Sequence, residues 1–193
     1  MKAVIVSFVI AFWGLSASAC VDQGSGFVRG ERLELTDCGD VGPWTPFDME
    51  LSYLSALRAD DVVVIRASDT SQLVEFADSF VITIPSYEAV RTQIATEGAA
   101  TVLIGPDGVV VSLALIETCP DSMTPLMGRE GTITFTHLGT LTGERIAAEL
   151  EFELINARSQ ESVGIAFRAS IDFKVQAGTP YESFSDPRRQ HGE

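Results

Sequence analysis

The chain has 193 residues, of which 46% are hydrophobic, and a formal net charge of −14. Its 27 acidic residues outnumber 13 basic ones and no cluster of Lys or Arg occurs. This balance argues against nucleic acid as a partner and against electrostatic docking on anionic lipid.

The first nineteen residues have the layout of an export signal. Lys2 is followed by an apolar run over 3–13, and the stretch ends in Leu15-Ser16-Ala17-Ser18-Ala19-Cys20. A charged start, an apolar region and small residues before a cleavage site are typical of signal peptides. We therefore predict that residues 1–19 are removed from the mature protein.

The end of this signal, Ala17-Ser18-Ala19-Cys20, resembles the lipobox of bacterial lipoproteins. It departs from that pattern at Ala17, where the family more often has Leu. The resemblance covers about the first tenth of the chain. It implies that Cys20 is the lipid-attachment residue, carrying a diacylglyceryl group and an amide-linked fatty acid such as palmitate. It also implies a membrane-anchored protein of the bacterial cell envelope that faces outside the cytoplasm. Val21, in place of Asp, favours the outer membrane where one exists.

Two other interpretations fit the same residues. Ala17-Ser18-Ala19 also matches the cleavage site of an ordinary secreted protein. Alternatively, the segment could remain as an uncleaved anchor, although 3–19 is slightly shorter than the ~20 residues that span a bilayer.

Three cysteines, Cys20, Cys38 and Cys119, occur in the chain. If Cys20 is lipidated, the even remainder in an exported protein predicts a Cys38–Cys119 disulfide. The alternative is a pair of free or metal-binding thiols, which would lack a histidine at ligand spacing.

In the first half of the chain, short strands are expected. The polar, Gly-rich segment 20–26 predicts a flexible tether, and the Pro-containing segment 43–46 predicts a loop. Residues 48–57 fit a strand and a short helix equally. β-Branched and aromatic runs predict strands over 27–36, 62–66, 73–76 and 80–84.

A helix is predicted over 86–97, with Ser86 as its cap and an end at Gly98, although a strand also fits. The sequence Gly105-Pro106-Asp107-Gly108 predicts a hairpin turn between strands 102–104 and 109–116. Residues 122–130 then read as a loop.

The last third alternates most regularly between apolar and polar residues. Strands are predicted over 131–138, 145–154 and 163–175, the last two forming a hairpin with one buried face. In this pattern His137 falls on the inward face.

These elements predict a mostly β protein: an antiparallel β-sandwich or two small β units, with one short helix near 86–97. The β-rich body is expected to span 27–177, with a candidate sub-boundary near 120–130, followed by a flexible tail over 178–193. This body loosely resembles the β-rich exported domains of uncharacterised bacterial lipoproteins around 117–120 and 131–135, a resemblance that implies no activity.

The sequence predicts no catalytic residue, metal site or cofactor. His137 fits a hydrogen-bonded strand histidine better than a general base. Two sets of acidic residues fit solvated surface acids better than sites: Asp37, Asp40, Asp48, Asp60, Asp61 and Asp69 as calcium ligands, and Glu149, Glu151 and Glu153 as glycosidase carboxylates. Trp44 with Tyr53 could form a sugar platform, but Trp44 fits a loop-covered core residue better.

We therefore expect a lipid-anchored envelope protein with a non-catalytic binding or structural role. Its partners would be the membrane, through the lipid, and a protein or glycan that the sequence does not identify. The alternatives are a secreted hydrolase that uses acidic residues and a calcium-dependent adhesion module.

Overall fold

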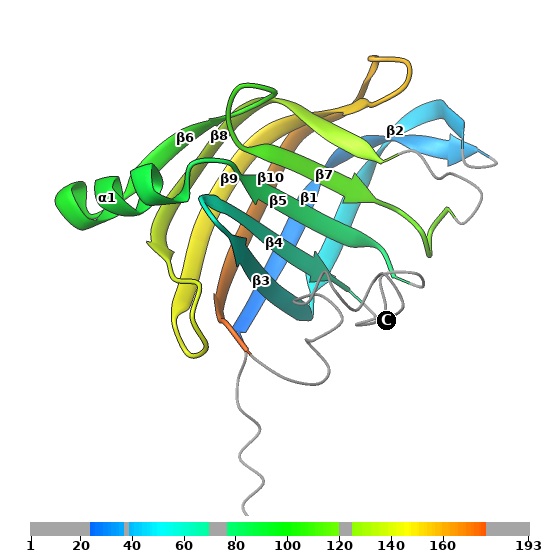
Figure 1. The fold of residues 1–193 in the computed structure, drawn as a ribbon. Helices are drawn as coiled ribbons and strands as arrows, with labels where there is room; N and C mark the ends of the chain where they lie inside the picture. Colours follow the sequence, from blue (N-terminus) through cyan, green and yellow to red (C-terminus); the bar gives the residue numbers. More distant parts are fainter. Residues whose placement is uncertain (1–23, 37–38, 70–76, 120–124, 177–193) are drawn as a thin grey trace, which may run out of the picture.

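A single antiparallel sheet contains every strand of the part of the chain that the structure describes (Figure 1). That structure is a computed structural model, and it describes residues 24–36, 39–69, 77–119 and 125–176. In chain order the elements are β1 (Gly24–Thr36), β2 (Gly39–Leu51), β3 (Tyr53–Ala59), β4 (Val62–Ser68), β5 (Ser79–Ile84), α1 (Tyr87–Glu97), β6 (Ala100–Ile104), β7 (Val110–Ala114), β8 (Leu126–Leu138), β9 (Arg145–Asn156) and β10 (Ser162–Lys174). The predicted mostly β, antiparallel class is confirmed, with one curled sheet in place of two stacked ones.

The strand order explains the curl. Neighbours in the sheet run β2-β1-β10-β9-β8-β7-β5-β4-β3, and β6 also pairs with β8. The two outermost strands, β2 and β3, are separated in the chain by Ser52 alone. The amide of Ser52 donates to the carbonyl of Ser68 at 2.9 Å, which ties this corner to β4. Because a single residue joins the two edge strands, the two edges of the sheet must lie close together. The sheet therefore curves into a half-barrel with an enclosed inner face.

The first hairpin differs from expectation at both of its strands. β1 begins at Gly24, so the last three residues of the predicted tether are strand. The segment 43–46 belongs to β2 instead of a loop, with Trp44 opposite Leu33 and Pro46 opposite Glu31. Proline lacks an amide donor and is tolerated where one edge of a strand makes no ladder, as here.

The predicted hairpin around Gly105-Pro106-Asp107-Gly108 is wrong, although the turn itself exists. β6 pairs with the 131–135 part of β8, and β7 pairs with Leu126 and Met127 at its start. Both are antiparallel to the same strand, so β6 and β7 run in the same direction, one after the other. The turn connects the end of β6 to the start of β7 without forming a hairpin. The predicted loop over 122–130 is likewise strand from Leu126 onward.

The helix and the last hairpin are confirmed. α1 ends at Gly98, whose φ of 83° is left-handed and whose amide donates to the Ile94 carbonyl at 2.9 Å. β9 and β10 pair along their length, with Arg145 opposite Lys174 near one end.

Aromatic rings fill the inner face. The ring centroids of Phe47 and Phe167 lie 5.6 Å apart, those of Phe167 and Phe152 lie 5.6 Å apart, and those of Phe152 and Phe80 lie 5.9 Å apart. These four residues come from β2, β10, β9 and β5, so the column of rings joins strands far apart in the sheet. Gly30 leaves room for it, because a Cβ there would lie 2.6 Å from Phe167 Cδ2. Function is therefore better sought on the outer face.

Candidate functional site

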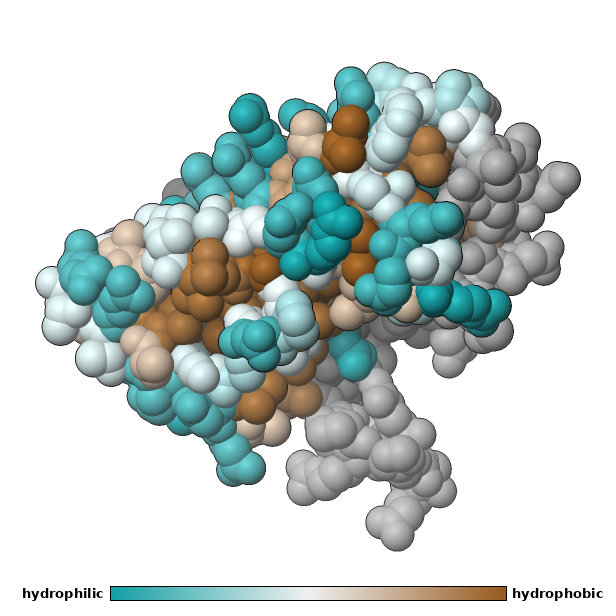
Figure 2. Space-filling model, turned by 90° about the horizontal axis from the view of Figure 1, so that it is seen from above, coloured by the Kyte–Doolittle hydropathy of each residue, from teal (hydrophilic) through white to brown (hydrophobic). Residues whose placement is uncertain are grey.

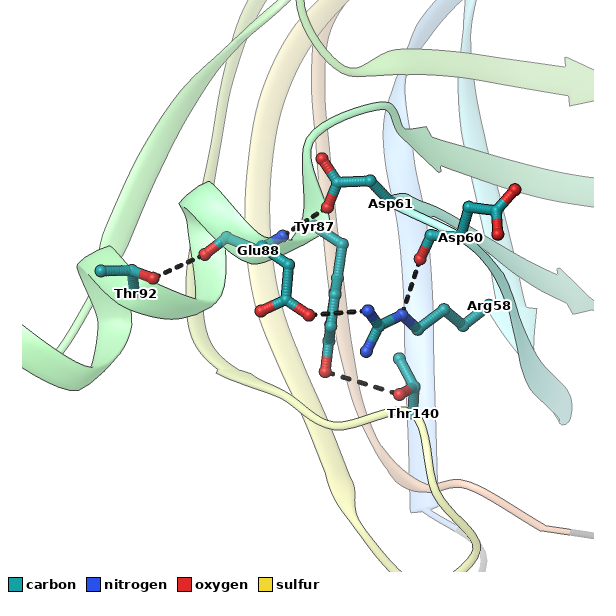
Figure 3. Close-up of polar contacts among 7 residues, drawn as sticks. All are labelled: Arg58, Asp60, Asp61, Tyr87, Glu88, Thr92 and Thr140. Carbon is teal, nitrogen blue, oxygen red and sulfur yellow. Dashed lines mark hydrogen bonds and ion pairs between the residues drawn. The ribbon is translucent and has the colours of Figure 1, made fainter.

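Helix α1 is fastened to the turn between β3 and β4, and this fixes the site beside it (Figure 3). The amide of Glu88 donates to Asp61 Oδ1 at 2.8 Å, and the amide of Tyr87 donates to the Asp61 carbonyl at 2.8 Å. Ser86 occupies the N-cap position, but its side chain makes no cap hydrogen bond. The predicted cap is therefore supplied by a residue 27 positions away in the chain.

Arg58 completes the attachment. Its guanidinium lies over the ring of the fully buried Tyr87, with Cζ 4.1 Å from the centroid, and its Nη2 is 2.6 Å from Glu88 Oε1 (Figure 3). The Tyr87 hydroxyl is 3.5 Å from Thr140 Oγ1, on the loop between β8 and β9. The helix is thus held between two loops, with Arg91 on the side that faces β8 and β9.

The candidate site is a pair of adjoining depressions on the outer face of β8, β9 and β10, which we call the outer hollow. One has a volume of about 330 Å³ and is lined by Arg91, Ile94, Ala95, Thr136, His137, Leu138, Gly139, Glu144 and Arg145. The other has a volume of about 280 Å³ and is lined by Thr134, Thr136, Arg145, Ala147, Ala148, Glu149, Ser170, Ile171 and Asp172. Thr136 and Arg145 line both, so the two depressions adjoin.

Charged groups of the hollow are held in pairs. Arg145 binds Asp172 with two bonds, Nε to Oδ1 at 2.7 Å and Nη2 to Oδ2 at 2.5 Å. This contact lowers the pKa of Asp172 and raises that of Arg145. The amides of Leu141 and Thr140 donate to Glu144 and lower its pKa, and the charge of Arg91 acts in the same direction. Asp172 and Glu144 are therefore ionised at neutral pH and fixed in place, which suits hydrogen bonding to a ligand.

The predicted inward position of His137 is wrong. The register shifts between Phe135 and His137, where Phe135 faces Ala148 and His137 faces Ala147. This bulge reverses the alternation, so His137 is exposed and Leu138 is buried. His137 Nδ1 lies 3.3 Å from Thr136 Oγ1. The bulge thus moves the imidazole from the core to the rim of the hollow.

Cys20 and Cys38 lie outside the residues whose side chains the structure describes. Cys119 is fully buried and disulfide-bonded. The buried Asp78 carboxylate organises the turn before Cys119, because its Oδ1 accepts the amides of Glu117 at 2.9 Å and Thr118 at 3.1 Å. The Cys38–Cys119 pairing and the lipidation of Cys20 stay predictions.

The acidic candidates are distributed over the surface. Asp48 lies 2.9 Å from Arg29, and Asp61 caps α1. The side chains of Asp37 and Asp40 fall outside the described residues. Among the side chains that are described, no group of three or more His, Cys, Asp or Glu could hold a metal ion.

The structure also describes the three glutamates on the outer side of β9, and the aromatic residues Trp44 and Tyr53. Glu151 lies 3.3 Å from Arg168 and Glu153 lies 2.9 Å from Arg129, whereas Glu149 lines the hollow. Trp44 is 42% exposed on a strand, so the prediction of a loop-covered core residue is wrong. Tyr53 lies on β3, at the opposite edge of the sheet from β2, which carries Trp44.

Sequence reasoning missed Arg91, Arg145 and Asp172 as site residues. Alternation did place Arg145 on the polar face of its strand. The register of the β9–β10 hairpin, in which Arg145 faces Lys174 and Ala147 faces Asp172, would have been the signal for the ion pair. Arg91 had no such signal, because its place depends on how α1 docks.

In comparisons with known proteins, no family model, no curated protein and no solved structure matches this chain. None of the helices in the described part of the chain is both long and apolar enough to cross a membrane.

Proposed function

We propose that this chain is a lipid-anchored protein of the bacterial cell envelope that binds a ligand in the outer hollow without converting it. The anchor rests on the apolar leader and on Ala17-Ser18-Ala19-Cys20. Binding rests on one observation, the outer hollow with its fixed charged groups and hydroxyls.

The lining favours a hydroxyl-rich ligand such as an envelope glycan. Thr134, Thr136 and Ser170 supply hydroxyls, while Glu149 supplies a hydrogen-bond acceptor. Ala147, being small, leaves space at the centre of this face. Sugars are bound by such mixed sets of donors and acceptors, because each sugar hydroxyl both donates and accepts.

The state of the carboxylates argues for binding over hydrolysis. A general acid at neutral pH needs a raised pKa, as in glycosidases. In this hollow the pKa values of Asp172 and Glu144 are lowered by the hydrogen bonds that they accept.

The anchor is tested by blocking lipidation. We expect Cys20→Ser, and globomycin treatment of the wild type, to give unprocessed or released protein when membranes are fractionated. Cleavage to the mature size together with unchanged membrane fractionation in both experiments would refute the anchor.

Binding is tested with two glutamates of β9 that point to the same side. On a glycan array that includes peptidoglycan fragments, we expect Glu149→Ala to lose binding and Glu151→Ala to retain it, because only Glu149 lines the hollow. Equal binding by both variants, or none by the wild type, would refute this site.

We also propose the Cys38–Cys119 disulfide, which the buried, bonded state of Cys119 supports. Peptide mapping by mass spectrometry without reduction should recover the two cysteines in one linked peptide. Recovery of Cys38 as a free thiol would exclude the pairing.

A further inference from the structure

One end of the curled sheet lies next to the predicted lipid. Gly24, the first residue of β1, faces Phe173 of β10; Phe173 faces Ile146, and Ile146 faces Leu138 of β8. This row forms one end of the sheet, at the bottom of Figure 1. Only three residues separate Gly24 from Cys20. The four steps from one to the other can stretch to about 14 Å.

The loop that follows Leu138 projects from this end, and its shape is fixed by hydrogen bonds. Glu144 Oε2 accepts the amides of Thr140 at 2.7 Å and Leu141 at 2.9 Å. The Gly143 amide donates to the Val175 carbonyl at 2.8 Å, which joins the loop to the end of β10. The tip therefore has a preformed conformation.

Leu141 is exposed at the tip of this loop. Its side chain is 69% exposed, and it stands between two threonines and two glycines. Apart from the constrained Glu144, the loop 139–144 carries no charge, whereas the turn of Asp60 and Asp61 and the turn 157–161 are charged. In a chain with a net charge of −14, a neutral apolar tip is the part that a lipid surface repels least.

A second apolar region is too far from the anchor to compete. Apolar side chains gather beside α1 in Figure 2, and Leu103 of β6 is 72% exposed. Leu103 faces Thr132, and pairing continues from Thr132 through Glu151 and Arg168 to Arg29. Arg29 lies five residues beyond Gly24, or roughly 17 Å farther from the anchored end.

We infer that the loop 139–144 contacts the lipid surface when the chain is anchored through Cys20, with Leu141 inserted at the level of the headgroups. This inference rests on the proposed lipid anchor and adds the orientation of the folded chain relative to the membrane. The outer hollow shares Gly139 and Glu144 with the loop, so its helix side lies near the membrane and its β10 side opens along the sheet.

The test compares two leucines of nearly equal exposure, Leu141 at the anchored end of the sheet and Leu103 roughly 17 Å away from that end. The full chain, with its leader, is produced in bacteria as Leu141→Trp and Leu103→Trp, each combined with Trp44→Phe to remove the background. Each purified protein is reconstituted in phosphatidylcholine vesicles whose acyl chains are brominated. We expect the emission of the Leu141→Trp protein to shift to the blue and to be quenched, and that of the Leu103→Trp protein to remain unchanged.

Two controls separate the possible failures. Intact mass of the N-terminal peptide reports whether Cys20 carries lipid, and circular dichroism checks that both variants are folded. An unlipidated peptide would overturn the anchor and this inference together. A lipidated protein in which Leu141→Trp is not quenched, or in which Leu103→Trp is quenched equally, would overturn the orientation alone.

Discussion

The inner and outer faces of the curled sheet are stabilised in opposite ways. On the inner face, Phe47, Phe80, Phe152 and Phe167 contact one another, and glycines make room for their rings. On the outer face, arginine–carboxylate pairs such as Arg145–Asp172 join neighbouring strands and remain exposed. Exposed ion pairs contribute at most about 1 kcal/mol, whereas a buried aromatic ring contributes several. Stability should therefore depend on the inner face and ligand binding on the outer one.

The largest effect is expected at the centre of the inner face. Phe167→Ala should lower the free energy of unfolding by about 3–5 kcal/mol, because the ring contacts two others and leaves a cavity. Urea unfolding followed by circular dichroism measures this change. The control is Leu103→Ala, which should change stability by less than about 0.5 kcal/mol because the side chain is 72% exposed. Similar losses in both variants would contradict the contrast between faces.

The next effect concerns two glycines with positive φ. Gly98→Ala should cost about 1 kcal/mol, because φ is 83° and no heavy atom lies within 4 Å of an added Cβ. Gly131→Ala should cost about 1–3 kcal/mol more, because its Cβ would lie 2.1 Å from the Glu151 carbonyl oxygen within the sheet. Thermal and urea unfolding of both proteins would check the difference, and equal costs would count against this close approach.

At the surface, Asp61→Ala should destabilise the protein by about 1 kcal/mol, because it removes the cap of α1. Ser86→Ala is the matched control: it occupies the N-cap position without a side-chain bond and should have little effect. A larger loss for Ser86→Ala than for Asp61→Ala would show that the cap is assigned to the wrong residue.

The smallest effect is the pH dependence of the loop 139–144. The pKa of Glu144 is lower in the folded than in the unfolded chain, so its contribution to stability is present above the unfolded value of about 4.3 and is lost as pH falls through the folded value. Urea midpoints measured from pH 7 down to acid should therefore decline less steeply for Glu144→Gln than for the wild type. Equal slopes for the two proteins would contradict the assignment of this pH dependence to Glu144.

Much of the fold followed from local patterns. Alternation over 145–154 and 163–175 predicted two strands of one hairpin, because a half-buried strand requires period two. Gly98 predicted the end of α1 because a left-handed residue favours glycine. Where the pattern failed, an irregularity intervened: the bulge before His137 reversed its face, and an edge position allowed Pro46 in a strand.

The candidate site was far less predictable, because its residues meet only through packing. Arg91 reaches the hollow because Asp61 and Arg58 hold α1 in place, and neither contact is local in sequence. Gly105-Pro106-Asp107-Gly108 encodes a turn but does not encode which strand its flanks pair with, and both flanks pair with β8.

The sequence by itself determined the antiparallel β class and the helix that ends at Gly98, because each depends on composition or spacing along a short stretch. The leader with its cysteine stays a prediction of the same kind. Tertiary structure alone decided that β2 and β3 close the curl at Ser52, that a hollow forms on the outer face, and that Leu141 shares an end with Gly24. These features depend on register and on contacts between distant segments, and such contacts are set by the fit of the whole sheet around its core.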